Sequence, residues 1–469
     1  MKNLITIATT LTILLAGSTA RPEDSFTTPT FTNVHGPPGI SIQADNRIGS
    51  AWFDYNNDGL PDHYSVDTST SDRLHRNDGN GNFTNVTETT EGFPVNEQVN
   101  EVRFDSGGLS VYGLDYDNDG DDDIFLFRNT TAQTTLESNH LFQNQGDETF
   151  IDVAPETGLE FLPNTGIFPG WLDANNDGLL DWRMKPERDE DFDQVDNPFY
   201  HFFLQNPDHT FTDSVEGSGL DDNRGLENGS VMPLDFNSDG LMDIVIGVLA
   251  PEFNVYQNIG DAQFINVTEQ SGIPRETDSH GNIPADYDND GDLDFYMPVV
   301  FLSQDNNRLW QNDGTGFFTD VTDIAGVPGM PVPGQNPATT ESTLGPTWGD
   351  FNNDGWIDLH VPQFTVSLSD ALRDLLYMNN GDGTFREVAI ESGLPGFERN
   401  THSTLCDFDR DGDLDIWVSP NFGFLPQVYR NDTVTSNTWL SVTVEGTTSN
   451  RPGIGARVYV EADTNGDGE

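Results

Sequence analysis

The chain has 469 residues, a formal net charge of −59 and a single cysteine. This excess of acid excludes the electrostatic attraction on which binding to nucleic acids and to anionic membranes depends, and one cysteine excludes an internal disulfide. The 31 phenylalanines and 46 glycines favour short strands joined by tight turns, whereas helical patterns are weak throughout. Cys406 lies on a predicted strand, where a buried small apolar role is favoured over a reactive thiol.

Residues 1–20 are predicted to be a signal peptide. A charged start at Lys2 precedes the apolar run Leu4–Ala16, and Ser18 and Ala20 provide the small residues of a cleavage site after Ala20. An uncleaved membrane anchor is the alternative, but the run is shorter than the ~20 residues that a span needs. No later segment is long enough to cross a bilayer, so we expect a secreted, extracellular protein, or a periplasmic or cell-surface one if the source is bacterial.

The next feature is a nine-residue acidic loop, seen most clearly at Asp115–Asp123, which reads D-Y-D-N-D-G-D-D-D. Oxygen-bearing side chains stand at positions 1, 3, 5 and 9, and a glycine at position 6 permits a sharp turn. Hard cations such as calcium take six to eight oxygen ligands, and the first half of the loop matches the EF-hand rule. A short apolar strand follows instead of an EF-hand helix.

The pattern D-x-[DN]-x-D-G-x-x-D occurs seven times, with starts separated by 51 to 64 residues. Polar turns without a metal are the alternative interpretation, but so many carboxylates in one loop repel one another unless a cation neutralises them. The sequence therefore predicts about seven calcium sites. Their predicted ligands, with the backbone carbonyl at position 7, are Asp54, Asn56, Asp58, Leu60, Asp62, Asp115, Asp117, Asp119, Asp121, Asp123, Asp173, Asn175, Asp177, Leu179, Asp181, Asp235, Asn237, Asp239, Leu241, Asp243, Asp286, Asp288, Asp290, Asp292, Asp294, Asp350, Asn352, Asp354, Trp356, Asp358, Asp407, Asp409, Asp411, Asp413 and Asp415.

Each loop belongs to a repeat of four predicted strands. One strand enters the loop, as at Gly170–Asp173, and another leaves it, as at Asp243–Val248. A third ends in asparagine, as at Leu309–Asn312, and the fourth reads Phe-x-x-Val, as at Phe385–Val388, with a looser version at Phe211–Val215. Seven repeats of four short antiparallel strands predict an all-β fold, a seven-bladed β-propeller.

The two ends of the repeat array predict a closed ring. Phe31–Val34 is a fourth strand without a preceding loop, and the seventh repeat reaches Val428–Asn431 without a Phe-x-x-Val strand of its own. The N-terminal strand is therefore expected to complete the last blade, which would also remove an exposed sheet edge.

The segments that precede the entering strands are expected to surround the central channel on the face opposite the loops. Two histidines there, with nearby acids Glu227 and Asp278, could form an acid/base or transition-metal cluster. Polar rim residues bonded to backbone are the favoured alternative. Arg47 at the same rim could bind a carboxylate or a sugar acid of a ligand. The rim segments are Asn46–Arg47, Asp105–Ser106, Asn164–Thr165, Glu227–Asn228, Asp278–His280, Glu341–Ser342 and Asn400–His402.

These motifs together resemble the FG-GAP/VCBS repeat, which also builds the integrin α propeller, over residues 26–432. The tail, Asn437–Val444 followed by Ser449–Val458, is similar to the start of an ASPIC/UnbV domain, so residues 433–469 are expected to form a partial domain of that kind. The pair of modules resembles the cartilage acidic protein family. That resemblance implies an extracellular calcium-binding protein, with adhesion or matrix association in animal members.

No G-x-S-x-G, H-E-x-x-H or Walker motif occurs. We therefore expect a non-enzymatic module that binds a protein or glycan partner, with calcium in a structural role. The enzyme alternative is a carbohydrate-active protein, similar to a polysaccharide lyase, with its site on the channel rim. A passive module of a larger surface assembly is a third possibility. Loops with Asn at position 3 are expected to bind calcium more weakly than those beginning at Asp115, Asp286 and Asp407.

Overall fold

The structure is a computed structural model of the whole chain. It describes residues 10–11, 27–34, 40, 49–66, 72–93, 110–127, 139–160, 169–184, 201–220, 230–247, 253–275, 279, 281–299, 307–329, 341–342, 345–365, 373–394, 400–420, 426–435, 437, 439–440, 442–447 and 449–458.

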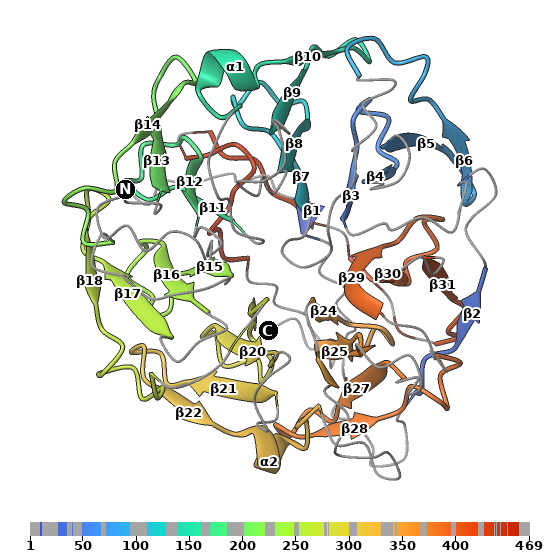
Figure 1. Ribbon diagram of the computed structural model, residues 1–469. Helices are drawn as coiled ribbons and strands as arrows, with labels where there is room; N and C mark the ends of the chain where they lie inside the picture. The colour runs from blue at the N-terminus through green and yellow to red at the C-terminus, as the bar shows by residue number, and fades with distance from the viewer. Residues whose placement is uncertain are drawn as a thin grey trace, which may run out of the picture.

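Seven four-stranded antiparallel sheets stand around a central axis as the blades of a propeller (Figure 1). In every blade the strand that enters the acidic loop is innermost, and each following strand pairs outside the previous one. The predicted all-β, seven-bladed fold is thus confirmed. The blades are β3(Ser50–Phe53), β4(Asp62–Ser65), β5(Arg73–Gly79), β6(Asn82–Asn85); β7(Ser110–Leu114), β8(Asp123–Phe127), β9(His140–Asn144), β10(Phe150–Asp152); β11(Gly170–Leu172), β12(Asp181–Met184), β13(His201–Gln205), β14(Phe211–Asp213); β15(Val231–Leu234), β16(Asp243–Ile246), β17(Asn254–Asn258), β18(Phe264–Asn266); β19(Ile283–Ala285), β20(Asp294–Met297), β21(Arg308–Asn312), β22(Phe318–Asp320); β24(Thr347–Gly349), β25(Asp358–Val361), β27(Leu375–Asn379), β28(Phe385–Glu387); and β29(Asn400–Cys406), β30(Asp415–Pro420), β31(Gln427–Asn431), β2(Phe31–Asn33).

The seventh blade joins the two ends of the propeller. Its outermost strand is β2, whose Phe31 pairs with Asn431 of β31. The backbone N–H of Phe31 also donates to Ser392 O at 2.7 Å, and its ring meets Phe351 edge-on with centroids 5.8 Å apart. The strand thus carries both backbone and apolar contacts that hold the first part of the propeller to the last.

The hydrophobic core lies between neighbouring blades. The second strand of each blade is buried along its whole length, which explains the continuous apolar runs that follow the loops. Between the second and third blades, Phe125 meets Trp171 and Trp182 edge-on, each with ring centroids 5.3 Å apart. Such aromatic pairs add to the stability gained from burial alone.

A few short elements lie outside the blades. The helices α1(Ala154–Thr157) and α2(Thr322–Ala325) follow fourth strands and end at Gly158 and Gly326, both at positive φ. Two small sheets pair β23(Glu341–Ser342) with β26(Phe364–Thr365) and β1(Thr10–Leu11) with β32(Val442–Thr443). Apart from β1, the predicted signal peptide lies outside the described residues. In the described part of the chain, no helix combines the length and apolar character of a membrane span.

Candidate metal centre: the seven acidic loops

Each acidic loop connects the first and second strands of its blade, and all seven share one hydrogen-bond pattern. In the loop of the second blade, Asp115 Oδ1 accepts the N–H of Asp119 and Oδ2 accepts that of Gly120, both at 3.0 Å. Asn118 and Gly120 have φ of 61° and 101°, a backbone that asparagine and glycine adopt more readily than other residues. Positive φ at positions 4 and 6 curls the chain around its own carboxylates.

The aspartate at position 9 is the buried anchor of the loop. Its relative exposure is 0–2% in all seven loops. Asp123 accepts the N–H of Tyr116 at 3.0 Å and that of Asn144, from the third strand, at 2.7 Å. The equivalent bond from the third strand spans 2.7–2.9 Å in every blade. Position 9 therefore fixes the end of the loop to the sheet.

Burial makes these carboxylates hard to ionise when no cation is bound. Desolvation raises the pKa of Asp62 to about 8 and that of Asp415 to about 9. At position 1, desolvation followed by repulsion from Asp117 raises the pKa of Asp115 to about 7. A divalent cation would favour the ionised forms, and carboxylate, amide and carbonyl oxygens are the donors that calcium prefers. The residues of the loops therefore fit calcium.

The loops fall into two classes by the residue at position 3. Within the described residues, carboxylate oxygens from three different aspartates lie within 4.8 Å of one another in three loops, at Asp115–Asp117–Asp123, Asp286–Asp288–Asp290 and Asp407–Asp409–Asp415. These three loops have Asp at position 3. In the other four, the Asn at position 3 donates to the Asp at position 5 at 2.9–3.1 Å.

The structure assigns a role that the sequence did not reveal to the residue that ends each third strand. The side-chain amide of Asn144 donates to Tyr55 O, at position 2 of the preceding blade's loop, at 2.7 Å. The same bond occurs at all seven blade junctions over 2.7–2.9 Å, with Gln205 in place of asparagine once. The recurring asparagine was visible in the sequence, but its partner in another blade was not.

A second set of contacts joins the loops directly. The asparagine at position 4 donates to the carbonyl of the glycine at position 6 in the next loop: Asn118 to Gly178 at 2.9 Å and Asn289 to Gly355 at 3.1 Å, for example. Asn176 and Asn353 make the same bond, each at 3.3 Å. These bonds link four pairs of neighbouring loops on one face of the propeller, and Asn57 of the first loop donates instead to Asp121 Oδ1 of the second.

The opposite rim is only partly described. Ser279, Asn400 and Thr401 are buried. Asn400 donates to Asp374 at 2.6 Å and Thr401 to Ser419 O at 3.0 Å, while burial lowers the pKa of His402 to about 4. Ser279, Asn400 and Thr401 are thus packed polar groups, whereas His402 is half-buried. The side chains of Glu341–Ser342, and the remaining rim residues with Arg47, Glu227, Asp278 and His280 among them, lie outside the described residues.

Comparison with known proteins agrees with this architecture. The family model of the FG-GAP-like repeat matches residues 54–126, 115–182, 235–297, 299–361 and 365–418, more than half of the chain. The chain belongs to the FG-GAP-like repeat family. The matched ranges end before the tail, and the ASPIC/UnbV resemblance stays a prediction.

Among relatives of this FG-GAP-like protein, human Cartilage acidic protein 1 is 27% identical over 199 residues, which is 41% of this chain and 28% of that protein. Solved structures with a similar arrangement include BBS1N in complex with ARL6DN, at 9% identity and a TM-score of 0.42 over 91% of this chain and 99% of that one. An ancestral GH74 enzyme gives 10% identity and a TM-score of 0.44 over 87% of this chain and 52% of the other.

Proposed function

We propose that this FG-GAP-like propeller is a secreted calcium-binding protein that binds a protein or glycan partner, with calcium in a structural role. The observation that carries the calcium part is the repeated frame of the loops: seven buried aspartates at position 9, each held by the N–H groups of position 2 and of the third strand. A cation bound there would tie the first, second and third strands of a blade together.

The energetic consequence is that calcium and folding are coupled. A ligand that binds the native state and not the unfolded state stabilises the protein according to its concentration, and the carboxylates must lose their protons to bind a metal. The net charge of −59 adds repulsion that seven calcium ions would partly offset. Extracellular calcium is compatible with sites of low affinity, which agrees with the proposed export.

The test is a thermal melt of the protein from residue 21 onward, after removal of metal, with and without calcium, together with a count of bound calcium by elemental analysis. We expect a large rise of the midpoint with calcium and a stoichiometry of about seven. Magnesium at the same ionic strength is the control, because screening of the acidic surface would raise the midpoint with either ion. No bound calcium and no calcium-specific shift would overturn the proposal.

The partner-binding part rests on the fold and on the similarity to human Cartilage acidic protein 1. A rigid ring offers a broad surface for a partner on the face opposite the acidic loops, where the strand connections lie. The test is binding of the calcium-loaded protein to arrays of extracellular matrix proteins and glycans, with the metal-free protein as control. If the protein binds none of the arrayed proteins or glycans, the proposal of a binding module is contradicted.

We also propose that the protein has no catalytic activity. Among the described rim residues, Ser279, Asn400 and Thr401 are buried, and the last two donate hydrogen bonds to Asp374 and Ser419 O, which supports a structural role for this part of the rim. Incubation of the pure protein with acidic polysaccharides tests the enzyme alternative. Turnover that disappears in His280→Ala would replace the binding proposal with a lyase-like one.

A further inference from the structure

The ring of contacts between loops is interrupted at one place. Loop position 4 in the fourth blade is Ser238, which has the same positive φ, 61°, as the asparagines at this position. It has a short hydroxyl in place of the carboxamide whose amide reaches the next loop in other blades. At the junction of the seventh and first blades the longer Arg410 stands at position 4, and its guanidinium reaches Gly59: a Cβ added to that glycine would lie 3.4 Å from it.

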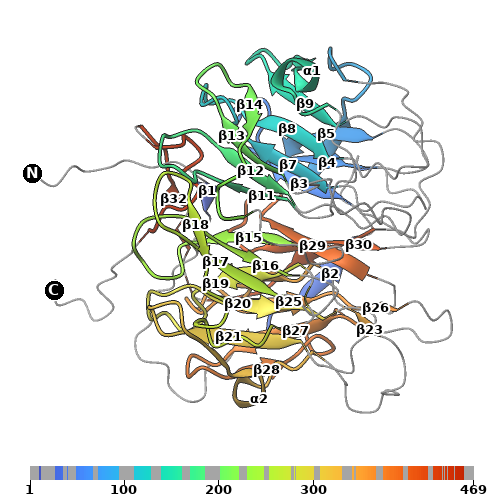
Figure 2. The same cartoon turned by 60° about the vertical axis from the view of Figure 1, so that its left-hand side comes forward.

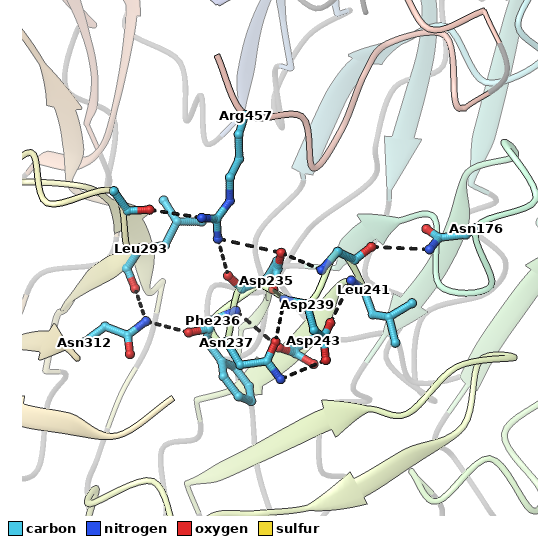
Figure 3. A network of polar contacts seen from close by, with 12 residues as sticks. Asn176, Asp235, Phe236, Asn237, Asp239, Leu241, Asp243, Leu293, Asn312 and Arg457 are labelled. Carbon is cyan, nitrogen blue, oxygen red and sulfur yellow. Dashed lines mark hydrogen bonds and ion pairs between the residues drawn. The ribbon is translucent and has the colours of Figure 1, made fainter. Parts of the chain in front are cut away.

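An arginine from the C-terminal segment bridges the loops of the fourth and fifth blades. Arg457 donates through one guanidinium nitrogen to Gly291 O at 3.0 Å and through the other to Asp235 O at 3.1 Å (Figure 3). Gly291 O is the carbonyl at position 6 of the fifth loop, the atom that an asparagine at position 238 would be placed to reach. The second nitrogen also lies 3.7 Å from Asp235 Oδ2, so charge supplements the hydrogen bonds.

Other residues of the same segment contact the loops of the sixth, seventh and second blades. Asn437 donates to Asn352 O at 3.2 Å, and Trp439 lies directly against Gly412. The backbone N–H of Arg451 donates to the side chain of Asn118 at 2.6 Å. The order of these contacts follows the order of the blades around the ring, and Figure 2 shows the red C-terminal segments together on one side of the propeller.

Apolar contacts accompany the polar ones. Ile454 packs against the cluster that contains Leu180, beside the third loop, and a Cβ added to Gly455 would lie 2.7 Å from Met242 Sδ in the fourth. The lack of a side chain at residue 455 therefore lets the segment approach the loop closely just before Arg457. Glycine is the residue that permits such an approach.

We propose that the loop face of the propeller is a docking surface for the chain's own C-terminal segment, through Asn437, Trp439 and residues 451–457, and that Arg457 replaces the missing bond between the loops of the fourth and fifth blades. The segment is then held to the propeller by contacts within the chain and is not an independent tail. This inference does not rest on calcium binding, because every contact that carries it joins protein atoms, and it is tested in calcium-free buffer.

The test is a double-mutant cycle on Arg457 and Ser238, measured by thermal unfolding and by chymotryptic cleavage near Trp439. Arg457→Ala should lower the midpoint by about 1–3 °C, since it removes two charge-assisted hydrogen bonds from a large domain, and should speed cleavage several-fold. Ser238→Asn should restore the midpoint in the Arg457→Ala background, because the new amide can bond Gly291 O directly. Cleavage should remain fast in the double variant, since the C-terminal segment still lacks the contacts of Arg457 with the loop face.

Arg451→Ala is the matched control, because it removes an arginine of the same segment at a loop where Asn118 already bonds Gly178 O. Ser238→Asn should not rescue it. An equal effect of Ser238→Asn in the wild-type, Arg457→Ala and Arg451→Ala backgrounds would overturn the proposal, because independent sites contribute additively. An Arg457→Ala protein with unchanged midpoint and unchanged cleavage would overturn it as well.

Discussion

Asn77 and Phe408 are 331 residues apart in the chain and are joined by a hydrogen bond of 2.9 Å from the Asn77 side-chain amide to the Phe408 carbonyl. This bond closes the ring of blade-to-blade contacts between the first and seventh blades. The same amide donates to Pro61 O at 3.0 Å, and Asn77 Oδ1 accepts the N–H of Gly79 at 3.0 Å. One buried side chain thus satisfies three backbone groups in two blades.

We predict that Asn77→Leu lowers the free energy of unfolding by about 2–4 kcal/mol, because leucine leaves several buried backbone groups without partners. Urea or thermal unfolding measures the loss. Asn82→Leu in the same blade is the control, because Asn82 is exposed and bonds only carbonyls of its own turn, Gly79 O and Asn80 O. Equal stability of the two variants would show that the junction bond contributes little.

The sequence was sufficient to predict the loops and strands because each loop needs aspartate and glycine at fixed positions, and seven copies make that pattern unmistakable. The contacts between blades were not predictable in the same way. An asparagine before a turn, such as Asn258, satisfies ordinary turn preferences, and its bond to Ala174 O depends on how neighbouring blades pack. Likewise nothing local to Arg457 reveals that it bonds Gly291 O and Asp235 O, because these contacts depend on how the C-terminal segment packs against two neighbouring blades.

The pH dependence of the metal-free protein follows from the buried aspartates. With pKa values of about 8 for Asp62 and about 9 for Asp415 in the folded state, the native protein keeps protons that the unfolded chain releases near pH 4. The unfolded state therefore binds fewer protons, and the free energy of unfolding should fall as pH rises from about 5 to about 9. Melts of metal-free protein at pH 5.5, 7 and 8.5 measure this fall.

Calcium should change that pH profile. Because metal binding requires ionised carboxylates, the stabilisation by calcium should grow over the same pH range, and calcium binding near pH 7 should release protons. Calorimetric titration in buffers of different ionisation enthalpy detects the released protons.

For the metal-free protein, a midpoint that increases from pH 5.5 to 8.5 would contradict the argument that burial raises the pKa of these aspartates.

The acid at loop position 3 should control affinity. Asp288 accepts a hydrogen bond from Gln311 at 2.7 Å and belongs to a group of three close carboxylates. Asp288→Asn removes one charged ligand and should weaken one calcium site on the order of tenfold, which is about 1.4 kcal/mol. Asp313→Asn in the exposed turn of the same blade changes net charge equally and is the control. Identical calcium titrations of the two variants would exclude a ligand role for Asp288.

Cys406 offers a probe of the junction between the last and first blades. It packs against the cluster that contains Phe83, Phe408 and Trp417, and burial raises the pKa of its thiol well above the ordinary value. Since the thiolate is the reactive form, the folded protein should react slowly with a thiol reagent at pH 7, and the denatured protein should bind one equivalent rapidly. Removal of calcium should speed labelling of the native protein if the metal holds the blades together. Cys406→Ser, which has no thiol, is the control for non-specific labelling. Rapid labelling of the folded, calcium-loaded protein would show that the reagent reaches this junction and would contradict the prediction.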